Sequence, residues 1–208
     1  MIQVENEHYS FNKYTDFPRW TSYWHQIDET LKFKPNSVLI IGIGDDIVPM
    51  TLNNCVTKLE TFDIDPKLNP TYLGKIDEVD KIVSDDFDVI LCCQVLEHIQ
   101  FELFDKTLNK LSYLAKNMVV SLPYCHHKFF NVNIELPLLG IRNFHFSIPK
   151  FYKKWRFDGE HYWEIGASNY LLSDVKNKIV NSFNIIDTFS PINNLYHKFF
   201  ILESKNLG

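Results

Sequence analysis

Residues 37–46, SVLIIGIGDD, join an apolar run to two closely spaced glycines. The run predicts a buried central strand, because the strands of a parallel sheet are covered on both faces. Gly42 and Gly44 allow the backbone to approach a ligand, and the amides of a following helix point toward it. A dinucleotide-binding turn has a further glycine where this chain has Ile47, so pyrophosphate binding is disfavoured. The segment therefore predicts a strand, a turn and a helix beside a nucleotide-type ligand.

On both sides of this segment, short apolar runs alternate with helix-like segments, which is typical of an α/β sheet with helices on both faces. Strands are expected at 37–41, 57–62, 71–73, 87–93, 117–122, 183–188 and 197–203, and helices at 18–31, 101–115 and 169–179. About six residues join the last two strands, whereas a parallel crossover takes a dozen or more. The sequence therefore predicts a doubly wound sheet, mostly parallel with an antiparallel last strand.

Residues 124–166 interrupt this alternation. Apolar and polar side chains alternate from Phe130 to Leu136 and again from Phe144 to Ile148, with Gly140 between the two runs. Two such runs joined by a glycine-containing turn predict a β-hairpin. We interpret the chain as a single domain with an N-terminal helical segment, a ligand-binding core, an inserted hairpin lid, and a C-terminal helix with strands, at 1–35, 36–123, 124–166 and 167–208.

Length and composition limit the alternatives. The 208 residues, of which 45% are apolar, are enough for one domain with a large core. A net charge of −5 argues against a nucleic-acid-binding protein, which needs a basic face. No apolar run reaches the roughly 18 residues of a membrane span, and residues 1–10 do not resemble a signal peptide, so we expect a cytoplasmic protein. The four cysteines are then expected to be reduced thiols.

An acidic residue follows the second predicted strand. Asp63 comes 21 positions after Gly42, where a carboxylate can accept hydrogen bonds from both ribose hydroxyls of a nucleoside. A solvated aspartate at the end of a strand is the alternative. Together with the glycine turn, Asp63 predicts an adenosine-type ligand.

Four segments resemble the class I S-adenosylmethionine-dependent methyltransferases in order and spacing, namely SVLIIGIGDD (37–46), LETFDIDP (59–66), FDVILCCQVLEHI (87–99) and MVVSLPY (118–124). The third segment, with VLEH after the fourth strand, is the most specific, because dinucleotide dehydrogenases lack it. The resemblance covers about residues 17–123 and is of a bacterial type. It implies a Rossmann-like fold with an antiparallel last strand, S-adenosylmethionine as the cofactor, and methyl transfer as the reaction.

The resemblance also implies roles for single residues. In the family, the glycine turn holds the methionine end of the cofactor, the acid after the second strand binds ribose, and residues after the fourth strand line the methyl-transfer site. By position, the implied cofactor-binding residues are Gly42, Gly44, Asp63, Ile64, Gln94 and Val95. Many members have acids where this chain has Ile40 and Lys75, and we expect Asp77 to replace the second of these if the third strand continues. Arg19 is expected to pair with the carboxylate of the cofactor.

Methyl transfer requires chiefly that the nucleophile is aligned with the methyl group and that water is excluded. An alcohol nucleophile also benefits from a general base. Glu97-His98 lies at the sheet edge where open α/β sheets bind ligands, although both residues would alternatively cap or brace the following helix. The segment 159–166, GEHYWEIG, offers His161 and Glu164, and its alternative role is a buried polar network that anchors the insertion. We predict His98, His161 and Glu164 as the candidate catalytic residues.

Two aromatic clusters allow structural or functional interpretations. Trp20, Tyr23 and Trp24 follow helical spacing, which is ordinary for core packing. Residues 150–157, KFYKKWRF, interleave basic and aromatic side chains. We interpret this segment as a solvated edge with its rings turned inward. The alternative is a surface that binds an anionic substrate, a membrane or stacked bases. Residues 125–127, CHH, have no partner cluster with metal-ligand spacing, so we predict no metal.

The sequence thus predicts a methyltransferase that uses S-adenosylmethionine to methylate oxygen on a small molecule or a sugar. We expect no nucleic-acid partner and no membrane span, and the sequence does not indicate an oligomeric state. One alternative is a module that binds S-adenosylmethionine or an adenine nucleotide without catalysis. A nicotinamide-dependent oxidoreductase is less favoured, because Ile47 replaces the third glycine.

Overall fold

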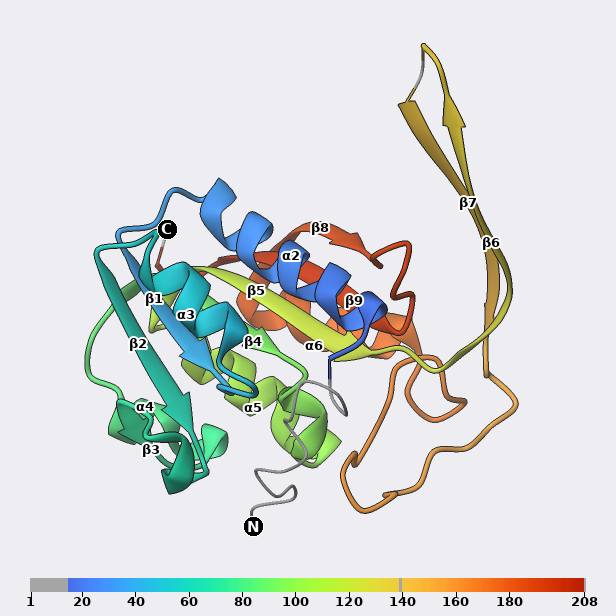
Figure 1. Ribbon diagram of the computed structural model, residues 1–208. Coiled ribbons are helices and arrows are strands. Elements are labelled where there is room, and N and C mark those ends of the chain that lie inside the picture. Colours follow the sequence, from blue (N-terminus) through green and yellow to red (C-terminus); the bar gives the residue numbers. More distant parts are fainter. Residues whose placement is uncertain (1–14, 139, 208) are drawn as a thin grey trace.

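The computed structural model describes residues 15–138 and 140–207 of the chain. At its centre lies a seven-stranded sheet with the strand order β3-β2-β1-β4-β5-β9-β8 (Figure 1). The strands are β1 (Ser37–Ile41), β2 (Lys58–Asp63), β3 (Tyr72–Leu73), β4 (Phe87–Cys93), β5 (Ala115–Pro123), β8 (Phe183–Phe189) and β9 (His197–Ser204). Strands β1 to β5 run parallel, and β9 is antiparallel to both β5 and β8. The predicted α/β sheet with an antiparallel last strand is confirmed.

The alternation of side chains along β1 explains why this segment is apolar throughout. Val38 and Ile40 pack into the hydrophobic cluster on one face of the sheet, and Leu39 and Ile41 pack into the cluster on the other. All four side chains are buried. A strand that is covered on both faces has no position left for a polar side chain.

Helices cover both faces of the sheet (Figure 1). Helices α2 (Phe17–Lys32) and α3 (Ile47–Asn53) contribute to one hydrophobic cluster, and α4 (Val79–Ile82), α5 (Phe101–Leu111) and α6 (Leu172–Ser182) contribute to the other. The part of the expected N-terminal segment before residue 15 lies outside the described residues. In the portion of the chain that the structure describes, no helix combines the length and the hydropathy needed to cross a bilayer.

Strands β6 (His126–Leu136) and β7 (Gly140–Pro149) form a separate antiparallel sheet that projects from the body of the molecule (Figure 1). Their pairing confirms the predicted hairpin, although residue 139 of its turn lies outside the described residues. Four apolar side chains of this hairpin are 45–55% exposed, namely Phe130, Val132, Phe144 and Phe146. The hairpin therefore carries apolar surface that the core does not cover. A lid function for residues 124–166 stays a prediction.

The third strand, β3, does not continue beyond its expected end. It ends at Leu73, and the chain continues as the 3-10 helix η3 (Ile76–Glu78). Gly74 lies between them, where a Cβ atom would approach Cδ1 of Ile82 to 2.2 Å. Asp77 therefore lies in a helical turn rather than on a continuation of β3, so the strand face that it was expected to share with Lys75 does not form.

The aromatic clusters are more exposed than predicted. Trp20 and Trp24 are 50% and 58% exposed, and Tyr23 is buried. Tyr23 lies on the side of α2 that packs against the sheet, whereas the two tryptophans flank that side. In residues 150–157, the ring of Trp155 is buried but the other three rings are more than half exposed. The expectation that the rings of this segment turn inward is therefore wrong except for Trp155.

Candidate active site

The turn after β1 has a backbone that favours glycine. Gly42 and Gly44 have φ angles of +85° and +64°, which side chains of L-amino acids rarely adopt. A Cβ atom on Gly42 would also lie 2.4 Å from Cγ2 of Val95. The backbone of the turn therefore packs directly against Val95, which follows β4. This close contact requires glycine at position 42.

The carboxylate of Asp63 holds this turn against the end of β2. Its Oδ2 atom accepts a hydrogen bond from the Ile43 N–H group at 2.8 Å, and its Oδ1 atom accepts one from the Asp65 N–H group at 2.8 Å. Each carboxylate oxygen has a further lone pair, so both can still accept a hydrogen bond from a ligand. The neighbouring Ile64 side chain is exposed. Asp63 is therefore a structural brace of the turn, and its role as a ribose ligand stays a prediction.

A pocket lies between α2, the glycine turn and the end of β4. Its lining includes four of the predicted cofactor-binding residues, Arg19, Gly42, Gly44 and Gln94. The Tyr23 hydroxyl, also in this lining, donates a hydrogen bond to Asp45 Oδ2 at 2.5 Å and so ties α2 to the turn. Among the described residues, the other predicted cofactor-binding positions, Asp63, Ile64, Asp77 and Val95, do not line this pocket.

The chain leaves β4 in a conformation that is unusual for a residue with a side chain. Gln94 has a φ angle of +57°. Its N–H group donates to the Ser121 carbonyl at 2.9 Å, and its Nε2 atom donates to Ser121 Oγ at 3.2 Å. Backbone outliers of this kind are found preferentially at functional sites. The 3-10 helix η4 (Leu96–His98) follows and places Glu97 and His98 beyond the end of β4.

The segment 159–166 folds back onto η4 and is held there by hydrogen bonds. The Tyr162 N–H group donates to the Glu97 carbonyl at 2.9 Å. The indole N–H group of Trp163, whose side chain is fully buried, donates to the Ile99 carbonyl at 3.0 Å. The segment thus anchors the inserted region to the sheet edge, and it brings its own polar side chains to η4.

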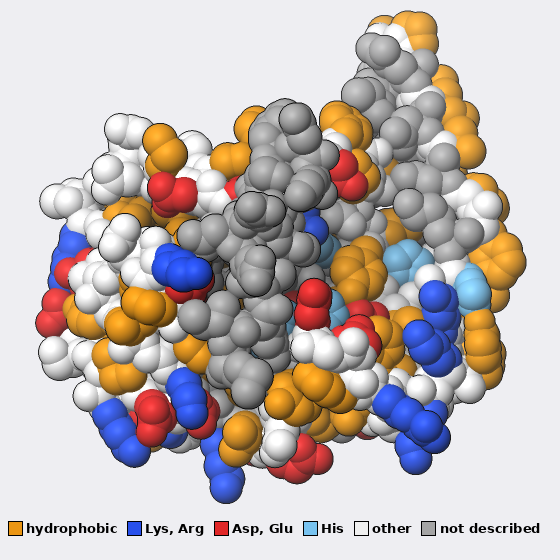
Figure 2. Space-filling model, turned by 60° about the horizontal axis from the view of Figure 1, so that its bottom comes forward, with side chains coloured by type: hydrophobic (Ala, Val, Ile, Leu, Met, Phe, Trp, Pro, Cys, Tyr) orange, Lys and Arg blue, Asp and Glu red, His pale blue; other side chains and the backbone are white. Residues whose placement is uncertain are grey.

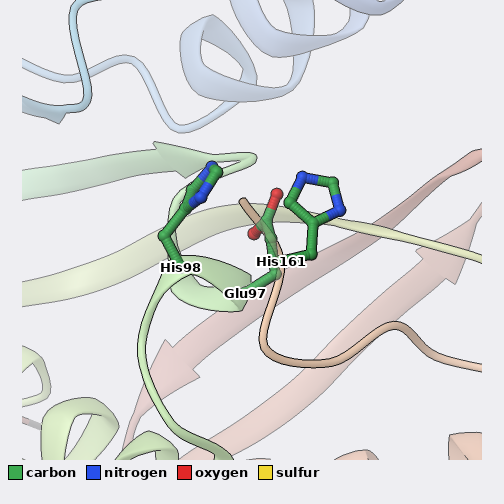
Figure 3. Close-up of side chains that lie close together, drawn as sticks. All are labelled: Glu97, His98 and His161. Carbon is green, nitrogen blue, oxygen red and sulfur yellow. The ribbon is translucent and has the colours of Figure 1, made fainter. Parts of the chain in front are cut away.

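The three predicted catalytic residues lie in one cluster. The ring centroids of His98 and His161 are 5.1 Å apart, and the two rings are steeply inclined to each other (Figure 3). His98 Nδ1 donates to the Glu160 carbonyl at 3.0 Å, and His161 Nδ1 lies 3.0 Å from Glu164 Oε1. The same Glu164 oxygen accepts a hydrogen bond from the Tyr196 hydroxyl. Figure 2 shows histidine and acidic side chains gathered next to one another on this face of the molecule.

Burial sets the electrostatics of the cluster. Glu97 is fully buried, and both of its carboxylate oxygens lack a hydrogen-bond partner in the described structure. Burial raises the pKa of Glu97 to about 8, because the charged form loses its hydration. Burial lowers the pKa of His98. Burial also acts to lower the pKa of His161, but the hydrogen bond to Glu164 and the charge of Glu97 outweigh it, so this pKa is raised. Glu97 does not cap α5, whose N-cap residue is Gln100.

Comparisons with known proteins bear on the fold. No protein-family model and no curated protein sequence matches the chain. The N-methyltransferase NodS from Bradyrhizobium japonicum, in complex with S-adenosyl-L-homocysteine, superposes with a TM-score of 0.63 at 9% identity, over 98% of this chain and 94% of NodS. CalS10 from Micromonospora echinaspora, an amino pentose methyltransferase bound to S-adenosylmethionine, has a TM-score of 0.62 at 9% identity, over 97% and 98%. The small RNA methyltransferase HEN1 has a TM-score of 0.59 at 15% identity, over 92% of this chain and 26% of HEN1.

The chain has the class I methyltransferase fold. In an open sheet of this type, ligands bind at the edge where the parallel strands end. In this methyltransferase fold, the glycine turn follows β1, Asp63 ends β2, and Gln94 and η4 follow β4. The pocket and the cluster of His98 and His161 therefore occupy the ligand-binding edge of the fold.

Two residues at this edge of the methyltransferase fold were not predicted from the sequence as site residues. Tyr196 contacts Glu164, and the buried His197 lines the pocket. Burial lowers the pKa of His197 to about 3, so this histidine is neutral in the folded protein at ordinary pH. Both precede or begin β9, where the sequence carries no motif. They lie beside the site because β9 pairs with β5. The short loop before β9 predicted that this strand is antiparallel, but not that it pairs with β5.

Proposed function

We propose that this protein is an S-adenosylmethionine-dependent methyltransferase that methylates a hydroxyl oxygen of a small molecule or a sugar. The pocket at the glycine turn carries the proposal, because Gly42 and Gln94 line it and the polar cluster of His98 and His161 begins only a few residues beyond Gln94. NodS and CalS10 share the fold and were solved with S-adenosyl-L-homocysteine and S-adenosylmethionine. Their ligands support the same cofactor for this chain.

The described residues fit the parts of this cofactor. The partly buried guanidinium of Arg19 lines the pocket and matches the carboxylate of a methionine group. The oxygens of Asp63 retain lone pairs that suit ribose hydroxyls. The missing Cβ atom at Gly42 lets the turn pack closely against Val95 after β4. When bound, the cofactor supplies a methyl carbon on a positively charged sulfur.

The chain contributes alignment, water exclusion and proton transfer to the reaction. The acceptor oxygen forms a bond to the methyl carbon while the bond from this carbon to sulfur breaks, and the electron pair of the broken bond stays on sulfur. The hydroxyl proton must leave as the new bond forms. We assign the promotion of this step to the polar cluster of His98, His161 and Glu164, because η4, which carries His98, directly follows Gln94 at the end of β4.

Calorimetric titration with S-adenosylmethionine and S-adenosyl-L-homocysteine tests cofactor binding. We expect one site per chain, with weaker binding in an Arg19→Gln variant and unchanged binding in the control Arg156→Gln, whose side chain is exposed in the segment 150–157. Absence of binding by well-folded protein would overturn the proposal. Binding of NAD instead would favour the oxidoreductase alternative.

Labelled cofactor, incubated with the protein and fractionated cell extract, tests the acceptor. Label in a small molecule or a sugar supports the proposal. HEN1 shares the fold and acts on small RNA, so label in RNA would overturn the proposed acceptor class. Tight cofactor binding without product in any fraction would favour the alternative of a binding module without catalysis.

A further inference from the structure

The buried carboxylate of Glu97 has no partner within the described structure. Its side chain is 0% exposed, and neither Oε1 nor Oε2 makes a hydrogen bond. Buried polar groups are paired in the great majority of cases, because an unpaired one has lost its hydration without compensation. Two unpaired oxygens on one buried carboxylate therefore indicate a partner that residues 15–138 and 140–207 do not supply.

The two imidazole rings beside Glu97 are each held by a hydrogen bond at one ring nitrogen. His98 uses Nδ1 to donate to the Glu160 carbonyl, and His161 uses Nδ1 to donate to Glu164 Oε1. Because Nδ1 of each ring is engaged in these hydrogen bonds, Nε2 is the nitrogen left for a metal ion. Histidines that bind metals almost always donate their other ring nitrogen to a carbonyl or a carboxylate in this way.

The ligand atoms also lie close enough to share one ion. One donor atom each of Glu97, His98 and His161 lies within 4.8 Å of the other two (Figure 3). Metal bonds of about 2.0–2.2 Å place ligand atoms about 3–3.5 Å apart, so small side-chain rotations close the site. We propose that Glu97, His98 and His161 together bind one divalent transition-metal ion.

The chemistry of the three ligands selects the class of ion. Two imidazoles and one carboxylate suit Zn²⁺, Fe²⁺, Co²⁺ or Mn²⁺, whereas Mg²⁺ and Ca²⁺ prefer sites made of oxygen alone. Glu164 and the Tyr196 hydroxyl form the outer contacts that orient the His161 ring. No metal was predicted from the sequence, because residues 125–127 have no partner cluster with metal-ligand spacing, whereas these ligands come from η4 and from the distant segment 159–166.

Three protein ligands leave coordination positions open, as in catalytic metal sites. On the basis of the proposed function, the acceptor hydroxyl would occupy an open position. A metal ion lowers the pKa of a bound oxygen, so the hydroxyl loses its proton to water more readily as the new bond to the methyl carbon forms. The bound ion would thus promote the loss of the hydroxyl proton, which is the role that the proposed function gives to this cluster.

Metal binding is tested on the full chain without cofactor. Chelator-treated protein is titrated calorimetrically with ZnCl₂, MnCl₂ and CoCl₂, and bound metal is counted by mass spectrometry. We expect one ion per chain, and at least hundredfold weaker binding in Glu97→Gln and in His161→Gln. The control is His127→Gln, because His127 is exposed and lies outside the cluster, and its binding should match the wild type.

A second readout guards against misfolded variants. The melting temperature of the wild type should rise with Zn²⁺ concentration, because an ion that binds the folded state stabilises it, and the melting temperatures of the two ligand variants should not. Folded protein that binds none of the three ions, or Glu97→Gln protein that binds as tightly as the wild type, overturns the inference. Cofactor binding without metal binding overturns this inference alone, and metal binding without cofactor binding overturns the proposed function alone.

Discussion

The substitution Asp63→Asn separates the structural role of Asp63 from its predicted role in ligand binding. The wild-type carboxylate accepts hydrogen bonds from two backbone N–H groups, those of Ile43 and Asp65, both at 2.8 Å. An asparagine of the same shape retains one acceptor oxygen and turns an NH₂ group toward the other N–H donor. One of the two hydrogen bonds is therefore lost, and one backbone donor is left without an acceptor.

The expected cost follows from this geometry. A hydrogen bond to a charged group contributes about 1.5–3 kcal/mol, so the free energy of unfolding should fall by about 2 kcal/mol in Asp63→Asn. Urea unfolding without ligand measures this change. Asp86→Asn serves as the control, because Asp86 is exposed away from the turn and surface substitutions usually stay within about 0.5 kcal/mol.

Calorimetry with S-adenosylmethionine then measures the binding role. If Asp63 also contacts ribose, affinity should fall at least tenfold, which corresponds to about 1.4 kcal/mol. If the free energy of unfolding of Asp63→Asn equals that of the Asp86→Asn control, Asp63 does not hold the turn against β2. Lower stability together with wild-type affinity would keep the brace and remove Asp63 from the ligand site.

Three further changes test other parts of the site. Gly42→Ala should lower the unfolding free energy by about 1–3 kcal/mol, because its Cβ meets Val95 at 2.4 Å; Gly44→Ala, which adds strain without a contact, should cost less in the same urea assay. The pKa of His197 lies near 3 in the folded protein and near 6.5 in the unfolded chain, so only the unfolded chain takes up the proton as pH falls below 6.5, and stability should drop by about 2 kcal/mol between pH 8 and pH 5. A His197→Leu variant should lack this part of the pH dependence, and an equal slope in both proteins would contradict the burial of a neutral histidine. Trp163→Phe removes an indole hydrogen bond from a fully buried position and should cost about 1–3 kcal/mol in urea unfolding; an unchanged midpoint would show that the bond does not anchor its segment.

The parallel core was predictable because its signals are local. The run 37–41 is apolar at every position after Ser37, which only a strand covered on both faces tolerates. The direction of β9 followed from the short loop before it. The helical turn η3 after β3 was not predicted, because residues 74–78 carry no local signal that distinguishes this turn from a continued strand.

The candidate site was predictable only in part, for a similar reason. Gly42 and Gly44 belong to one short turn, so their spacing alone indicates their role. The cluster of Glu97 and His161 forms between segments about sixty residues apart, as the hydrogen bond from His98 to Glu160 with its separation of 62 residues shows. Spacing along a helix likewise shows which residues share a side, but not that Trp20 at the border of this side stays 50% exposed.

The position of β9 has a consequence for the synthesis of the protein. β9 lies between β5 and β8, and both of these strands precede it in the sequence. Its buried Phe199 and Phe200 belong to the hydrophobic clusters on opposite faces of the sheet. A nascent chain that has already assembled β1 to β5 therefore keeps the edge of β5 unpaired, and both faces incompletely filled, until the ribosome has released β9. A translation stop before residue 197 would leave an aggregation-prone sheet edge rather than a shorter working protein.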